Sequence, residues 1–72
     1  MKELNQVILR VDIPEQRLKK GDIGTIVLEH QAGAAFEVEF MTLTGETIAI
    51  VTLEADQVRP IGKREIANAR TV

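Results

Sequence analysis

The sequence predicts an all-β domain: a small, partly open barrel of five short strands, with one 3₁₀ turn before the last strand. Two observations lead to this class. Short apolar stretches rich in β-branched residues recur along the 72 residues, and turn-forming residues separate them. Between these stretches no segment has the period of an amphipathic helix, which excludes βαβ folds. We expect the barrel to span residues 1–61 and a C-terminal tail, flexible or a short helix, to span residues 62–72.

The first strand is expected over residues 4–11. Pro14 follows and ends it, because proline has no N–H to donate to a strand ladder. A polar loop over residues 16–20 comes next, and Leu18 is the only apolar side chain in it. We therefore expect Leu18 to pack back against the core.

A Gly-Asp turn leads into the second strand. Gly21 can adopt positive φ and the Asp22 side chain can hydrogen-bond nearby backbone, so a sharp bend is expected here. The strand then covers residues 24–30. Because side chains alternate along a strand, Ile26 and Leu28 are expected to share one face.

The strictest alternation in the chain covers residues 35–40, where apolar and acidic side chains follow one another. Such a pattern predicts a strand with one face on the core and one in solvent. The core face is expected to carry Phe36, Val38 and Phe40, and the solvent face Glu37 and Glu39. The two phenylalanines are the only aromatic residues, and their place in the pattern indicates that they fill the core.

The fourth strand is expected over residues 47–53 and is apolar on both faces at its middle. Residues 54–57 are too few for a stable helix and predict a single 3₁₀ turn. The last strand follows over residues 58–61, where Pro60 indicates an edge or an end of the sheet. Residues 63–70 have some helical propensity, but an isolated turn or two is marginal in water. A frayed tail and a docked helix both stay open.

Two resemblances refine this prediction. The block at residues 20–27, Lys-Gly-Asp-Ile-Gly-Thr-Ile-Val, resembles the turn that enters the second strand of SH3-like barrels of the KOW type. Residues 2–60 as a whole resemble a family of small bacterial proteins of unknown function. The blocks at 18–27 and 36–40, and the segment 45–53, carry that similarity. It implies a five-stranded SH3-like barrel, no assigned activity, and a partner-binding or antitoxin-like role in a small bacterial operon.

Catalysis is not expected. The chain has no Ser, Cys, Tyr or Trp, so a nucleophile would have to be Thr, Lys or a carboxylate without the usual activating neighbours. His30 is the only histidine, and no partner stands at ligand spacing from it. We therefore expect a surface imidazole at His30, no metal site, no cofactor and no catalytic residues.

The charge distribution argues against nucleic acid as the main partner. The net charge is −2, and residues 1–60 carry ten acidic side chains against six basic ones. An acidic body repels phosphate, and the chain has no Tyr or Trp on which a base could stack. The alternative is a weak KOW-like nucleic-acid-binding domain, and its candidate basic loop is Arg17, Lys19 and Lys20.

No apolar run is long enough to span a membrane, so a cytoplasmic protein is expected.

The strands that are apolar on both faces point to association with another protein or a second copy. If Ile26, Leu28, Ile48 and Ile50 face the core, then Val27, Ala49 and Val51 lie outside and form a candidate interaction surface. Two alternatives stay open: the tail covers these residues through Ile66 and Val72, or they are scattered and carry no function. The expected function is a non-enzymatic protein-interaction module.

Overall fold

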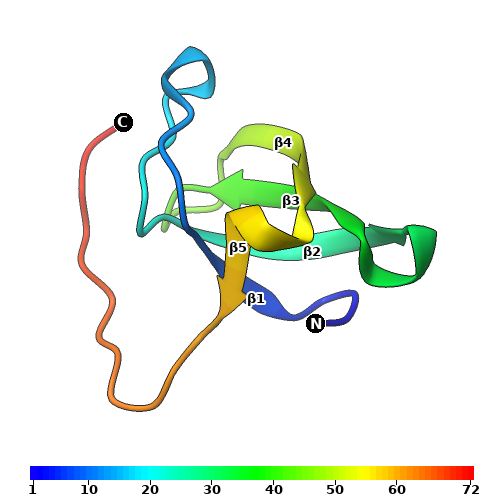
Figure 1. The fold of residues 1–72 in the computed structure, drawn as a ribbon. Helices are drawn as coiled ribbons and strands as arrows, with labels where there is room; N and C mark the ends of the chain where they lie inside the picture. Colours follow the sequence, from blue (N-terminus) through cyan, green and yellow to red (C-terminus); the bar gives the residue numbers. More distant parts are fainter.

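A computed structural model describes residues 1–72 and contains one sheet of five antiparallel strands. The strands are β1 (Gln6–Leu9), β2 (Ile23–His30), β3 (Ala35–Met41), β4 (Thr47–Glu54) and β5 (Val58–Pro60). Their order in the sheet is β4-β3-β2-β1-β5, so β4 and β5 are its two edges (Figure 1). The predictions of an all-β class and of five strands are confirmed.

Three 3₁₀ turns connect the strands: η1 (Pro14–Gln16), η2 (Gln31–Gly33) and η3 (Ala55–Gln57). The turn predicted before the last strand is η3, and a capping box closes it. Gln57 accepts a hydrogen bond from the Glu54 N–H at 2.8 Å, and the Glu54 side chain accepts one from the backbone of Gln57. No helix in the chain has the length and apolar character needed to cross a membrane.

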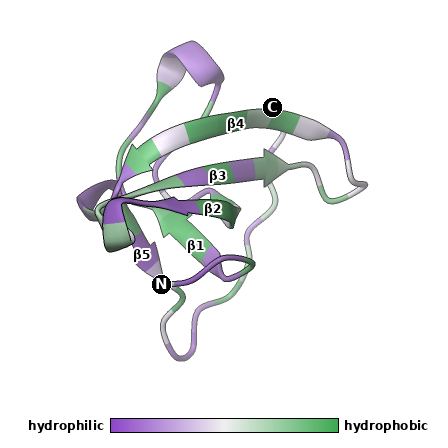
Figure 2. Ribbon diagram, turned by 90° about the vertical axis from the view of Figure 1, so that its right-hand side faces the viewer, coloured by the Kyte–Doolittle hydropathy of each residue, from purple (hydrophilic) through white to green (hydrophobic).

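The sheet is strongly bent, and its inner face holds one core. In Figures 1 and 2 the β1–β5 end of the sheet runs across β2, β3 and β4 rather than continuing their plane. The core consists of Val7, Leu9, Ile13, Leu18, Ile26, Phe36, Val38, Phe40, Ala49, Leu53 and Val58. Every strand contributes at least one side chain to it, and Leu18 joins it from the loop, as predicted.

β3 is the centre of this core. Phe36, Val38 and Phe40 are buried, and the predicted inward alternation is confirmed. The backbone of β2 lies close against this row at Gly24, where an added Cβ would lie 2.5 Å from Val38 Cγ1 and 2.9 Å from Phe40 Cε1. Glycine is needed at Gly24 because two core side chains occupy the space of its missing Cβ.

The loop between β1 and β2 folds back on itself. Ile13 and Leu18 form an isolated antiparallel bridge, with Arg17 in the left-handed region at φ 60°. At its end the Gly21 N–H donates to the Leu9 carbonyl at 2.8 Å, and Gly21 has φ +97°. The sharp bend predicted at the Gly-Asp turn is confirmed, and the turn is fastened to β1.

The face prediction for β2 is confirmed at Ile26 and wrong at Leu28. A bulge interrupts the β2–β3 register between Ile26 and Leu28, so that Ile26 pairs with Val38 and Leu28 pairs with Glu37. A bulge shifts the alternation by one residue. Leu28 therefore leaves the core face and is 44% exposed.

The face prediction for β4 is confirmed at Ile48, which packs against the core, and is wrong beyond it. Ala49 is buried in the core and Val51 packs against it, whereas Ile50 is 58% exposed. The register with β3 explains this, because Ala49 lies opposite Phe40 on the inner face. A small side chain fits beside the phenylalanine ring there, and Leu53, in phase with Ala49, fills the core further along.

Residues 61–72 form no helix, so the docked-helix alternative for the tail is wrong. The tail leaves β5 and runs back along the molecule to the β1–β2 loop (Figure 1). Ile66 is 91% exposed, which also excludes the expectation that Ile66 covers an apolar surface.

Candidate functional site

The outer face of the sheet carries carboxylates that neighbouring strands hold in place. Glu37 on β3 accepts a hydrogen bond from Thr52 Oγ1 on β4 at 2.7 Å. On its other side, Glu37 Oε2 lies 2.7 Å from His30 Nε2 on β2. Glu39 accepts from Thr47 Oγ1, also at 2.7 Å. These bonds tie β2, β3 and β4 together across the outer face.

The His30–Glu37–Thr52 group does not have the arrangement of a nucleophilic triad. The Thr52 hydroxyl donates to Glu37 rather than to His30, so no imidazole base lies beside the hydroxyl. The Thr52 hydrogen bond, followed by the one from His30, holds the pKa of Glu37 below its ordinary value. The carboxylate is ionised at neutral pH and acts as an acceptor that joins strands.

The two edges of the sheet differ sharply. β5 has three residues, of which Arg59 is charged and Pro60 lacks an N–H. β4 has eight residues, and from Thr47 to Leu53 it contains neither a charge nor a proline. β4 pairs with β3 alone, and no further backbone hydrogen bond reaches its other side. Figure 2 shows this strand at the margin of the sheet, coloured as hydrophobic over most of its length.

The predicted interaction surface is not assembled. Of its three residues only Val27 is exposed, at the β2 bulge, whereas Ala49 and Val51 contribute to the core. The exposed apolar side chain on β4 is Ile50, which lies opposite Glu39. Sequence reasoning missed Ile50, although the phase of Leu53 within the same strand was a signal that could have identified it.

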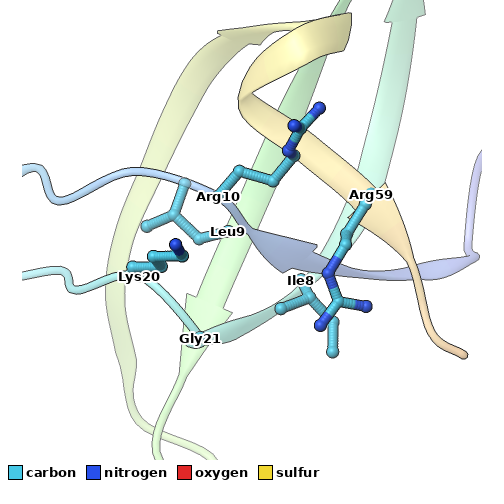
Figure 3. A pocket seen from close by; sticks show the side chains of 6 residues that line it. All are labelled: Ile8, Leu9, Arg10, Lys20, Gly21 and Arg59. Carbon is cyan, nitrogen blue, oxygen red and sulfur yellow. The ribbon is translucent and has the colours of Figure 1, made fainter.

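The predicted basic loop is divided between two hollows. Arg17 and Lys19 border one hollow of about 390 Å³. Lys20 borders another of about 330 Å³ together with Arg10 and Arg59. In Figure 3 the side chains of Arg10 and Arg59 extend in different directions and do not converge on one point. The loop therefore does not present its cations as a single patch.

The tail is attached to the five-stranded domain by two ion pairs. Arg59 on β5 donates to both carboxylate oxygens of Glu65, each at 2.7 Å. The Arg59 hydrogen bond, followed by that from the Gly62 N–H, lowers the pKa of Glu65 to about 2. Further along, Arg70 pairs with Asp22, the acidic residue of the Gly-Asp turn, at 2.6 Å. Sequence reasoning did not identify either contact.

Asp22 responds to two opposed influences. Partial burial favours its neutral form and acts to raise its pKa. The hydrogen bonds from Arg70 and from the Lys19 N–H, together with the charges of these two residues, outweigh burial. The net result is a lowered pKa, so the contact with Arg70 favours the ionised form of Asp22.

Comparison with known proteins identifies the family of this chain but finds no individual protein that matches it. No curated protein and no solved structure matches the chain. A family model described as a domain of unknown function (DUF4926) matches residues 3–60, which contain all five strands and end before the tail. The resemblance to a family of unknown function is thereby confirmed. The chain belongs to the DUF4926 family.

Proposed function

We propose that this protein is a non-enzymatic protein-interaction module built on an SH3-like barrel, and that its partner adds an extended segment to the free edge of β4. One observation carries the proposal: β4 is a long edge strand, uncharged from Thr47 to Leu53, and no backbone hydrogen bond pairs its outer edge. The antitoxin-like role implied by the sequence resemblance would be one case of such a module.

The strand arrangement supports the SH3-like assignment. β1 pairs with both β2 and β5, a long loop separates β1 from β2, and a 3₁₀ turn separates β4 from β5. The resemblance of the Gly-Asp turn to KOW-type barrels supports the same assignment. Folds of this type carry many functions, so the proposed function depends on the edge of the sheet and not on the fold.

An exposed edge strand is a template for pairing with another chain, and proteins usually block it with charges, proline, short length or a covering segment. β5 has three of these protections, since it is short and carries Arg59 and Pro60. β4 has none of them over Thr47 to Leu53. The unprotected edge is therefore suited to strand addition, in which backbone hydrogen bonds supply affinity and side-chain pockets supply specificity.

The test compares Ile50→Lys with Ile66→Lys. Both substitutions place a lysine at a highly exposed isoleucine, but only the first puts the charge on the β4 edge strand. The full chain is used to isolate the partner from its native cell, and amide hydrogen exchange of the purified complex is then measured. We expect new protection in β4 of the wild type, at least tenfold weaker binding by Ile50→Lys, and unchanged binding by Ile66→Lys.

Protection elsewhere in the complex, with β4 amides still exchanging freely, would refute strand addition. So would equal binding by Ile50→Lys and the wild type when both have the same unfolding midpoint. Light scattering of the free chain shows whether the added strand comes from a second copy, because self-pairing through β4 would make the mass concentration-dependent.

A second candidate is weak nucleic-acid binding, and the hollow of Figure 3 favours it. Arg10, Lys20 and Arg59 border this hollow; Arg59 is paired with Glu65, whereas Arg10 and Lys20 form no ion pair. A single-stranded oligonucleotide should then bind at low salt and weaken steeply as salt rises. Lys20→Gln should reduce the binding, with Lys2→Gln as the control. An affinity that does not change with salt would eliminate this candidate.

A further inference from the structure

The guanidinium of Arg70 occupies a receptor with three acceptor atoms. Arg70 Nε donates to Asp22 Oδ1 at 2.8 Å, and Nη2 donates to Asp22 Oδ2 at 2.6 Å. Nη2 also donates to the Arg17 carbonyl at 2.9 Å. Two of the acceptors are the oxygens of one carboxylate, and the third is a backbone carbonyl. This arrangement suits the planar, forked guanidinium of arginine and not the single ammonium of lysine.

The barrel builds this receptor without help from the tail. The Lys19 N–H donates to Asp22 Oδ2 at 2.8 Å, which fixes the carboxylate. The Asp22 N–H donates to the Lys19 carbonyl at 3.0 Å and the Leu9 N–H donates to the Asp22 carbonyl at 2.9 Å, which fixes the turn on β1. Left-handed backbone at Arg17 sets the direction of the remaining acceptor. All these residues lie within the family domain, residues 3–60.

The carboxylate is held in place independently of the tail, and the tail encloses it further. With Arg70 in contact, the Asp22 side chain is 17% exposed. A hollow of about 390 Å³ lies beside this contact, and it is bordered by residues of the β1–β2 loop, among them Pro14 and Leu18, and by the tail residues Arg70, Thr71 and Val72. A carboxylate fixed in advance loses little freedom when a cation arrives. When the tail leaves, the loop residues of this hollow become available to the rest of a bound chain.

The tail, by contrast, is a weakly held occupant. No residue after Val58 is buried, and Glu65 and Arg70 supply its two ion pairs with the barrel. The Arg59–Glu65 pair is the more exposed of the two and contributes little, so the tail stays in place mainly because its covalent linkage keeps Arg70 at a high local concentration near Asp22. A ligand with an arginine and a few additional contacts can displace it.

We propose that the Asp22 turn is a binding site for an arginine side chain of a partner protein, and that Arg70 occupies this site in the free chain as a built-in competitor. The proposal adds a partner chemistry and a form of regulation to the proposed interaction module. It concerns a different surface from β4, so the two proposals can fail separately.

The test uses the full chain with Arg70→Gln, and as probe the peptide Ile-Ala-Asn-Ala-Arg-Thr-Val, which copies residues 66–72. A second peptide carries lysine in place of its arginine. Backbone NMR spectra report the Lys19 and Asp22 amides. Arg70→Gln should shift these amides, and the arginine peptide should return them toward their wild-type positions. Binding should be at least tenfold weaker for the lysine peptide, and at least tenfold weaker for wild type than for Arg70→Gln.

The matched control is the double variant Asp22→Asn, Arg70→Gln, which should not respond to the peptide. Asparagine keeps an oxygen to accept from the Lys19 N–H, so the turn is retained, and unchanged β3 amide shifts verify the fold. Equal binding of the two peptides, no response of Arg70→Gln, or equal binding by wild type and Arg70→Gln would each overturn the inference. The Ile50→Lys variant should bind the arginine peptide like its parent, which separates this result from the β4 proposal.

Discussion

The five-stranded domain and its tail are held by different forces. The five-stranded domain has twelve buried apolar residues, all between Val7 and Val58, and no buried polar side chain. The tail has no buried residue and is attached by two ion pairs. Burial of apolar surface depends little on salt, whereas exposed charge pairs are screened by it. The tail can therefore detach under conditions in which the five-stranded domain remains folded.

Truncation of the core should have the largest effect. Phe36→Ala removes a fully buried aromatic side chain and should cost about 3–5 kcal/mol of unfolding free energy. A domain of this size has about that much stability in total, so the variant should be largely unfolded at room temperature. Urea titration followed by circular dichroism measures the change. Ile66→Ala, the control in the tail, should stay within about 0.5 kcal/mol of wild type.

Filling the space beside Gly24 should have the next largest effect. In Gly24→Ala the new Cβ would lie 2.5 Å from Val38 Cγ1, and relieving that overlap should cost about 1–3 kcal/mol. The double variant Gly24→Ala, Val38→Ala removes one of the two colliding groups. Its loss of stability should be smaller than the sum of the two single losses. Strict additivity would show that the collision does not explain the glycine.

Acid should release the tail, with a smaller loss of unfolding free energy than the two core substitutions cause. Both carboxylates that anchor it have lowered pKa values in the folded chain, and the pKa of Glu65 is about 2. A lowered pKa means that the contacts are complete above the ordinary carboxyl pKa of about 4 and are lost as the pH falls through the folded-state value. NMR shifts of the Arg70 side chain and the Gly62 amide should report this change. Release of either anchor on raising the pH from about 5 to about 8 would contradict it.

Salt should give the smallest change and separate the two regions most cleanly. Raising sodium chloride from about 0.05 M to about 1 M shortens the screening length from roughly 14 Å to roughly 3 Å. Trypsin cleavage after Lys63 or Arg70 should then become faster, whereas the urea midpoint should not fall. A urea midpoint that falls together with the loss of the tail would show that the stability of the five-stranded domain depends on its tail.

Much of the fold could be predicted because one strand has an unambiguous pattern. In β3 the inward and outward residues differ completely in polarity, so Phe36 and Glu37 could each be assigned to a face. Leu18 was predictable for a similar reason, since it is a lone apolar side chain in a polar loop. The Gly-Asp turn was predictable because few residues adopt its backbone conformation.

The faces of β2 and β4 could not be predicted, because both strands are apolar on either side. Which side of β4 faces inward depends on its pairing with Phe40, and that contact is not local in the sequence. The β2 bulge is equally hidden, since nothing in its sequence marks Val27 as the extra residue. The Arg70–Asp22 pair joins residues 48 positions apart and uses common surface residue types. Only the path of the tail brings them together.

The unequal edges of the sheet also limit how large an assembly can grow. A strand added to β4 meets a ready template, but β5 offers only a three-residue strand that ends in Pro60. Two copies joined through β4 would use up both available templates and form a closed pair with twofold symmetry. If the added strand comes from a different protein, each molecule can accept only one such strand. Fibrous growth, which needs a receptive edge at both ends of every unit, has no route through this sheet.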